Sequence, residues 1–245
     1  YIWAMHVLNQ FLDRGASTYN EPDQAHFYST HRTRLVITGL GAVAVALMLA
    51  WTLGIAVMVA MAGVSLLGIV YGVPIVPVRR RNRWQTAKIK DVPGSKTLAE
   101  SLAWGVVIAL IPLLEEVQTA WSGVTVSFLF VLAVVYVRSA LFDIFEVQGD
   151  MIVGIETLPV TIGEKRTVQL LKGVLAGCGV LLLGAGLLGA VPPIAYPLLL
   201  CVGSLALTIH TYETRWLYPG LRLETLVEAN LILAGLVGLV WQMAS

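Results

Sequence analysis

Three carboxylates, those of Asp143, Glu146 and Asp150, follow closely after the apolar run 124–137. If the helix continues past Arg138, the three acids stand at positions i, i+3 and i+7 and share one helix face. Proteins commonly bind Mg²⁺ through one or two carboxylates together with substrate phosphates and water. A row of carboxylates at the end of a membrane span therefore predicts a site for a metal ion and a phosphorylated headgroup. Ordinary solvated interfacial acids are the alternative that this pattern alone leaves open.

The composition is that of a membrane protein. Of the 245 residues, 57% are hydrophobic and 13% are charged, whereas a soluble domain normally carries about 25% charged residues. Cys178 and Cys201 both lie in apolar runs, so the sequence offers neither a disulfide framework nor a zinc site. The chain is therefore expected to bury few charges and to expose apolar side chains to lipid.

Seven apolar runs follow one another along the chain, and residues 1–13 resemble the last turns of a further span. Each run is close to the roughly 20 residues that cross a bilayer. The runs are continuous rather than alternating, which favours helices over barrel strands. They cover residues 35–53, 55–76, 98–115, 124–140, 168–188, 194–210 and 225–243. We predict an all-α, polytopic transmembrane helical bundle, with residues 1–245 forming a single domain.

The basic residues are segregated between the connections of these spans. All sixteen Lys and Arg residues lie in or beside alternate connections, namely those that contain residues 14–34, 79–96, 138–172 and 215–222. By the positive-inside rule these connections face the cytoplasm. The cytoplasmic face is then also the face that carries Asp13 and the acids near residue 146. A soluble phosphorylated substrate would arrive at this face.

Two pairs of polar residues have a spacing that belongs to a known family. Asn9 and Asp13 lie four residues apart, and so do Glu146 and Asp150. In these residues the chain resembles the UbiA family of intramembrane prenyltransferases, whose acidic motifs are written Asn-Asp-x-x-Asp-x-x-x-Asp and Asp-x-x-x-Asp. Residues 154–163 resemble the Gly-x-x-Thr-x-Pro continuation of the second motif. The similarity extends along the whole chain in order.

The resemblance implies a bundle of usually nine spans around a central cavity. The chain would then supply the end of the second span and the seven that follow, so the first span and most of the second would be missing. It implies Mg²⁺-dependent transfer of a prenyl group from an allylic prenyl diphosphate to a lipophilic acceptor, such as an aromatic or quinone precursor. It also implies a multi-pass protein of the cytoplasmic or inner membrane with its active face toward the cytoplasm. The implied partners are the two substrates and membrane lipid, without nucleic acid.

The resemblance also assigns roles to individual residues. The implied Mg²⁺ ligands are Asp13, Asp143, Glu146 and Asp150. Three of them, Asp13, Asp143 and Asp150, are expected to be catalytic because their metal ions would stabilise the departing diphosphate. The residues expected to bind the diphosphate are Asn9, Lys96 and Arg138.

Two departures from the family pattern support a different function. Gln10 and Ser17 occupy positions where the first motif has Asp, and neutral oxygens bind Mg²⁺ less strongly than carboxylates. The alternative is a catalytically impaired UbiA-like protein that binds a polyprenyl lipid or a quinone. The number of spans also fits a small transporter, but transporters commonly place their acids near the membrane midplane rather than at one face.

Two further expectations concern glycine and proline residues inside the spans. Gly173, Gly177, Gly184 and Gly186 are expected to permit close approach between helices, as small residues do in membrane bundles. Pro112 lies inside the run 98–115 and is expected to kink its helix.

Overall fold

The computed structural model of the chain describes Ala4, Val7 and residues 22–72, 74–80, 83–88, 94–115 and 120–244. The contacts of the chain fall into two compact units. Unit 1 comprises residues 1–96, 111–116 and 146–161, and unit 2 comprises residues 97–110, 117–145 and 162–245. That residues 1–245 form a single domain stays a prediction.

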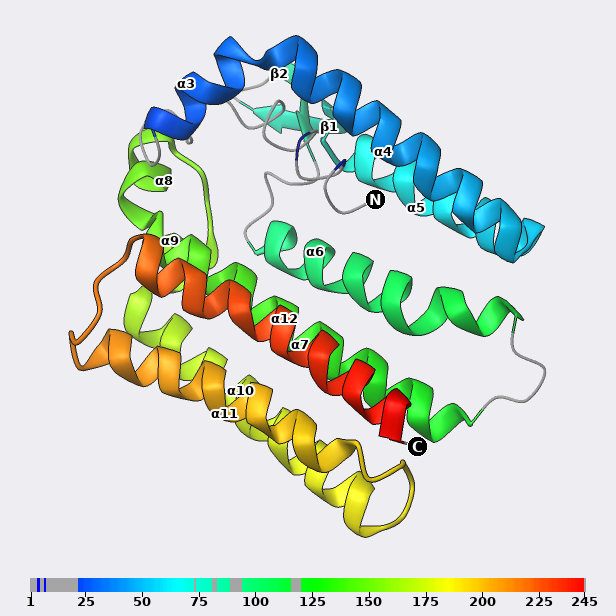
Figure 1. Ribbon diagram of the computed structural model, residues 1–245. Helices are drawn as coiled ribbons and strands as arrows, with labels where there is room; N and C mark the ends of the chain where they lie inside the picture. The colour runs from blue at the N-terminus through cyan, green and yellow to red at the C-terminus, as the bar shows by residue number, and fades with distance from the viewer. Residues whose placement is uncertain are drawn as a thin grey trace. The chain divides into compact units, whose positions relative to one another are not determined.

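Unit 1 begins with three consecutive helices. The helices are α3 (Pro22–Thr30), α4 (Arg32–Leu53) and α5 (Ile55–Gly72), and α4 packs against α5 (Figure 1). Gly54 alone separates α4 from α5 and has φ 152° and ψ 156°. This backbone conformation is essentially restricted to glycine. Gly54 therefore allows two apolar helices to fold back on each other with a one-residue connection.

A two-stranded hairpin follows α5 and was not predicted. Strands β1 (Pro74–Arg80) and β2 (Arg83–Lys88) are antiparallel, with Val78 opposite Gln85. The expectation that the span continues to residue 76 is wrong, because α5 ends at Gly72. Pro74 and Pro77 explain the difference, since proline lacks the N–H group that a helix requires and is tolerated in edge strands. Apart from this hairpin, the prediction of a helical bundle is confirmed.

The span near Pro112 changes its helix type twice. Helix α6 (Ser95–Gly105) continues as a π-helix, η2 (Val106–Leu110), and then as a 3₁₀-helix, η3 (Ile111–Glu115). Pro112 lies in η3 and removes one backbone donor, so the regular hydrogen-bond pattern is interrupted here. The kink expected at Pro112 stays a prediction, and the structure shows a change of helix type in this segment.

Four long helices form most of unit 2 and run beside one another (Figure 1). They are α7 (Trp121–Phe145), α10 (Glu164–Leu187), α11 (Ala195–Glu213) and α12 (Leu221–Ala244). Their shared core includes the fully buried side chains of Leu141, Leu171, Leu182, Leu205 and Ile209. Two short helices, α8 (Val147–Val153) and α9 (Leu158–Ile162), connect α7 to α10.

The apolar surfaces of the helices are mostly exposed. Among the residues that the structure describes, six helical segments are long and apolar enough to cross a membrane, and the segment 55–68 is a shorter apolar helix. Only 17% of the apolar window of α4 is buried, and 44% of that of α7. Side chains such as Leu40 and Leu187 are 67% and 77% exposed. Soluble proteins rarely expose so large an apolar surface to water. The chain is therefore an integral membrane protein.

Of the four glycines expected to permit close approach between helices, one does so in the structure. A Cβ atom on Gly173, Gly177 or Gly184 would meet no atom within 4 Å, so the packing role expected for these residues is wrong. Gly186 does permit a close approach, because its Cβ would lie 3.0 Å from Cζ of Tyr196. The tightest position is at the end of α6, where a Cβ on Gly105 would lie 2.8 Å from Cε2 of Phe128 in α7.

Gly105→Ala should therefore lower the thermal unfolding midpoint of the protein in detergent. The added methyl group must displace the Phe128 ring, and overpacking of this kind costs about 1–3 kcal/mol. Gly173→Ala is the matched control, since its methyl group meets open space and the helix gains up to about 1 kcal/mol in propensity. Equal midpoints for the two variants would contradict the close α6–α7 contact.

Candidate functional site

Asp143 lies in the last turn of α7 and is buried although it is a carboxylate. The residue is 2% exposed, and its Oδ2 accepts a hydrogen bond of 2.7 Å from Oγ1 of Thr97. Thr97 is fully buried in the first turns of α6. An acid buried at a span end is costly and needs polar partners. The α6–α7 contact therefore holds one of the predicted metal ligands in a defined orientation.

Arg138 lies about one and a half helical turns deeper in α7 and joins three helices. Its Nη1 donates to Oε1 of Glu100 in α6 at 2.8 Å, and its Nε donates to Oε1 of Glu228 in α12 at 3.1 Å. Its Nη2 also pairs with Glu228. Oγ of Ser139 donates to Oε2 of Glu100 at 2.7 Å, and the guanidinium group lies 5.1 Å from the centre of the Phe142 ring. Arg138 was expected to bind diphosphate, and here its guanidinium group bridges two carboxylates.

Glu146 and Asp150 belong to unit 1 and are not on the same continuous helix as Asp143. Helix α7 ends at Phe145, Glu146 is the residue before α8, and Asp150 lies within α8. The expectation of one uninterrupted helix face for the three acids is therefore wrong. Glu146 has φ −94° and ψ 1°, which takes it out of the helical conformation, although its carbonyl still accepts the Asp150 N–H group at 3.1 Å. Asp150 is 3% exposed.

The segment after Asp150 contains a glycine in the left-handed backbone conformation and a buried hydroxyl group for which the described residues provide no hydrogen bond. Gly154 ends α8 in the left-handed conformation, with φ 76° and ψ 33°, which glycine adopts without steric cost. Thr157 is 5% exposed, and its Oγ1 makes no hydrogen bond within the part of the chain that the structure describes. Buried hydroxyl groups normally have a partner. Thr157 is thus a candidate to contact a bound molecule.

The other predicted site residues can be placed only in part. Asn9 and Asp13 lie outside the described residues. Lys96 is an exposed residue in the first turn of α6. Its neighbour Ser95 contacts the hydroxyl group of Tyr71 in α5 at 3.0 Å between the two oxygens.

The described residues do not by themselves complete a metal centre. Within them, no three His, Cys, Asp or Glu side chains come close enough together to hold a metal ion. The donors that are present, buried carboxylates and hydroxyl groups, are the hard oxygen ligands that Mg²⁺ selects. The donor chemistry of Asp143 and Asp150 therefore fits Mg²⁺.

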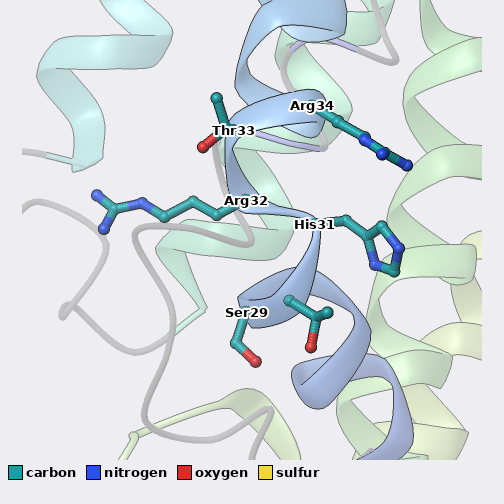
Figure 2. Close-up of a pocket in the computed structure, with 6 residues that line it drawn as sticks. Ser29, His31, Arg32, Thr33 and Arg34 are labelled. Carbon is teal, nitrogen blue, oxygen red and sulfur yellow. The ribbon is translucent and has the colours of Figure 1, made fainter.

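An open hollow at the start of α4 is lined by polar and basic residues. Its lining consists of residues 29–34, which join α3 to α4 (Figure 2). Figure 2 shows the side chains of Arg32 and Arg34 extending away from each other. Because the two guanidinium groups diverge, the hollow does not form a shared anion site.

Four residues of this region, Thr97, Glu100, Ser139 and Glu228, were not predicted from the sequence, and Thr157 was noted only as part of the motif in residues 154–163. A signal for two of them exists in the sequence. Glu100 and Glu228 are acids inside the apolar runs 98–115 and 225–243, and intramembrane acids normally pair with another polar group. Arg138 is a basic residue inside the apolar run 124–140, so it was available as their common partner. The Thr97–Asp143 hydrogen bond leaves no such signal.

Comparisons with known proteins agree with this architecture. A model for the VviA prenyltransferase family matches residues 22–242. A UbiA homologue from Archaeoglobus fulgidus bound to GPP and Mg²⁺ superposes with a TM-score of 0.66 and 16% identity, covering 96% of this chain and 81% of the homologue. The structure of such a homologue bound to DMAPP and Mg²⁺ gives a TM-score of 0.63, with the same identity and coverage. A search of curated proteins finds no match.

Arg138→Met should destabilise the protein, because it leaves Glu100 and Glu228 without their cation. The side chains of the two acids are 32% and 43% exposed, so we expect the cost of unpaired, partly buried polar groups, about 1–3 kcal/mol, and a corresponding fall of the thermal midpoint in detergent. Adding Glu100→Gln and Glu228→Gln should recover much of this lost stability, because neutral amide groups do not need a cationic partner.

Lys172→Met is the control for this experiment. It breaks the Lys172–Glu213 ion pair, in which the two side chains are 51% and 35% exposed, and such pairs contribute about 0–1 kcal/mol. A loss of stability in Lys172→Met as large as that in Arg138→Met would contradict the structural role of the Arg138 network.

Proposed function

Because the chain belongs to the VviA prenyltransferase family, and is therefore a prenyltransferase, we propose that it uses an allylic prenyl diphosphate and a lipophilic acceptor in a Mg²⁺-dependent reaction within the membrane. The observation that carries this proposal is the buried carboxylate of Asp143, which Thr97 holds at the end of a membrane span. An acid in such a place is a functional residue by default. The two structures of a UbiA homologue with the same fold, bound to Mg²⁺ with GPP or DMAPP, support the choice of substrate.

The proposed metal ligands are the acids at the span ends. Asp143 and Asp150 are buried; Glu146, and Asp13 from outside the described residues, complete the proposed set. When bound, Mg²⁺ supplies positive charge that stabilises the diphosphate as it leaves. Asn9 and Lys96 are proposed to bind phosphate oxygens. Thr157 is added because its buried hydroxyl group makes no hydrogen bond among the described residues.

In this proposal Arg138 does not bind the diphosphate. Its guanidinium group already donates to Glu100 and Glu228 and is 19% exposed at the side chain. Recruiting it would leave these two carboxylates uncompensated inside the spans, which is costly. Arg138 instead stabilises the helices that carry Asp143.

The helices also supply the apolar surroundings that the reaction needs. The allylic cation that forms as the diphosphate leaves would react with water, so the acceptor must attack it where water is excluded. We place the active face on the cytoplasmic side, on the basis of the Lys and Arg distribution. A quinone precursor is one acceptor class compatible with this chemistry.

The function can be tested on the natural protein in nanodiscs. The protein is incubated with radiolabelled prenyl diphosphates of several lengths and a lipid extract of the host, with Mg²⁺ or with EDTA. The proposal predicts a new labelled lipid that appears only with Mg²⁺ and whose mass identifies the acceptor. Binding of every label without turnover would contradict it and would favour a protein that holds an isoprenoid lipid without transferring it.

Asp150→Ala should abolish this Mg²⁺-dependent labelling. Loss of a group that merely supports a metal ligand costs about 10–100-fold in affinity or activity, so loss of a ligand should cost at least as much. Glu213→Ala is the matched control, because it removes an acid whose partner is the exposed Lys172. Equal activity of the two variants would overturn the assignment of Asp150.

A further inference from the structure

Helices α6 and α7 are joined by polar contacts at two levels. At the span end, Oγ1 of Thr97 donates to Oδ2 of Asp143 over 2.7 Å. About one helical turn along α6, Glu100 accepts from Nη1 of Arg138 at 2.8 Å and from Oγ of Ser139 at 2.7 Å. Two contacts on one face of α6 fix both the rotation and the axial register of the helix pair. The Thr97 hydroxyl group therefore meets Asp143 in a defined geometry.

The chemistry of the Thr97 contact differs from that of the Arg138 contacts. Thr97 is a neutral donor, and a carboxylate has about four lone-pair sites on its two oxygens. The Thr97 hydroxyl group donates to one of these sites and, being neutral, does not compensate the negative charge of the Asp143 carboxylate. The guanidinium group of Arg138, in contrast, compensates the charges of Glu100 and Glu228.

The hydroxyl group of Thr97 bonds neither to solvent nor to its own helix backbone in the way that the neighbouring Ser101 does. Thr97 is 0% exposed, so the group does not interact with solvent. Ser101, one turn along α6, is also 0% exposed, but its Oγ donates to the backbone carbonyl of Thr97 at 2.6 Å. The two neighbouring buried hydroxyl groups thus have different uses: Ser101 binds its own helix backbone, and Thr97 binds the acid on α7.

We propose that Thr97 is a positioning residue that orients the Asp143 carboxylate for a divalent cation. Residues that hydrogen-bond to metal ligands orient these ligands, and their loss commonly costs about 10–100-fold in metal affinity. The proposal rests on the proposed function, because it takes Asp143 as a metal ligand. It adds a residue to that site and predicts that metal affinity depends on the Thr97 hydroxyl group.

The test measures Mn²⁺ binding by electron paramagnetic resonance, with the natural protein in nanodiscs and saturating GPP as the probe. Thr97→Val removes the hydroxyl group at nearly constant volume and should raise the apparent Kd for Mn²⁺ by about 10–100-fold. Thr97→Ser keeps the donor and should stay close to the wild type. Ser101→Ala removes a neighbouring buried hydroxyl group that does not contact Asp143 and should also leave the Kd unchanged. The thermal midpoint of each variant reports whether it is folded.

The outcomes separate this inference from the proposed function. A wild-type Kd in folded Thr97→Val, with binding abolished in Asp143→Ala, would overturn the role of Thr97 and support the metal site. Equal weakening by Thr97→Val and Ser101→Ala, or by Thr97→Val and Thr97→Ser, would also overturn it. If the wild-type protein binds no Mn²⁺ with GPP, the proposed function fails, and the role of Thr97 fails with it.

Discussion

The ion network around Arg138 is the interaction on which the helices of unit 2 depend. In lipid the hydrophobic effect does not drive helices together, so association relies on close packing and on polar contacts between helices. Arg138 connects α7 to Glu100 in α6 and to Glu228 in α12. These two acids would be costly in a membrane span without a cation. The single guanidinium group therefore fixes three helices at one level of the membrane.

This arrangement separates two kinds of carboxylate in one membrane protein. Glu100 and Glu228 are bound by Arg138 and stabilise the bundle. Asp143, about one to two turns nearer the span end, is oriented by the neutral hydroxyl group of Thr97. A prenyltransferase that uses a diphosphate needs carboxylates of the second kind, because a metal ion requires negative oxygen ligands. In the proposed function, the network supports the helices that carry Asp143 and takes no part in the chemistry.

The sequence predicted the elements better than their contacts. Long apolar runs allow few structures other than spanning helices, and helices form at all seven runs. The helix predicted for residues 55–76 was too long, because Ile and Val residues occur in strands as well as in helices. In the structure the strand β1 begins at Pro74. The interruption at Glu146 and the partners of Arg138 and Thr97 were not predicted. They depend on tertiary contacts between residues tens of positions apart, which the periodicity of one segment does not contain.

In the proposed function, Asp143 serves ligand binding more than it serves folding. The most direct test compares the thermal midpoints of the wild type and Asp143→Asn in detergent, without ligand and with Mg²⁺ and GPP. Asparagine can still accept the Thr97 hydrogen bond, so we expect the unliganded midpoints to be similar. Ligand that binds only the native state raises the midpoint, and this rise should occur in the wild type and be absent in the variant. The same ligand-induced rise in Asp143→Asn would contradict the account.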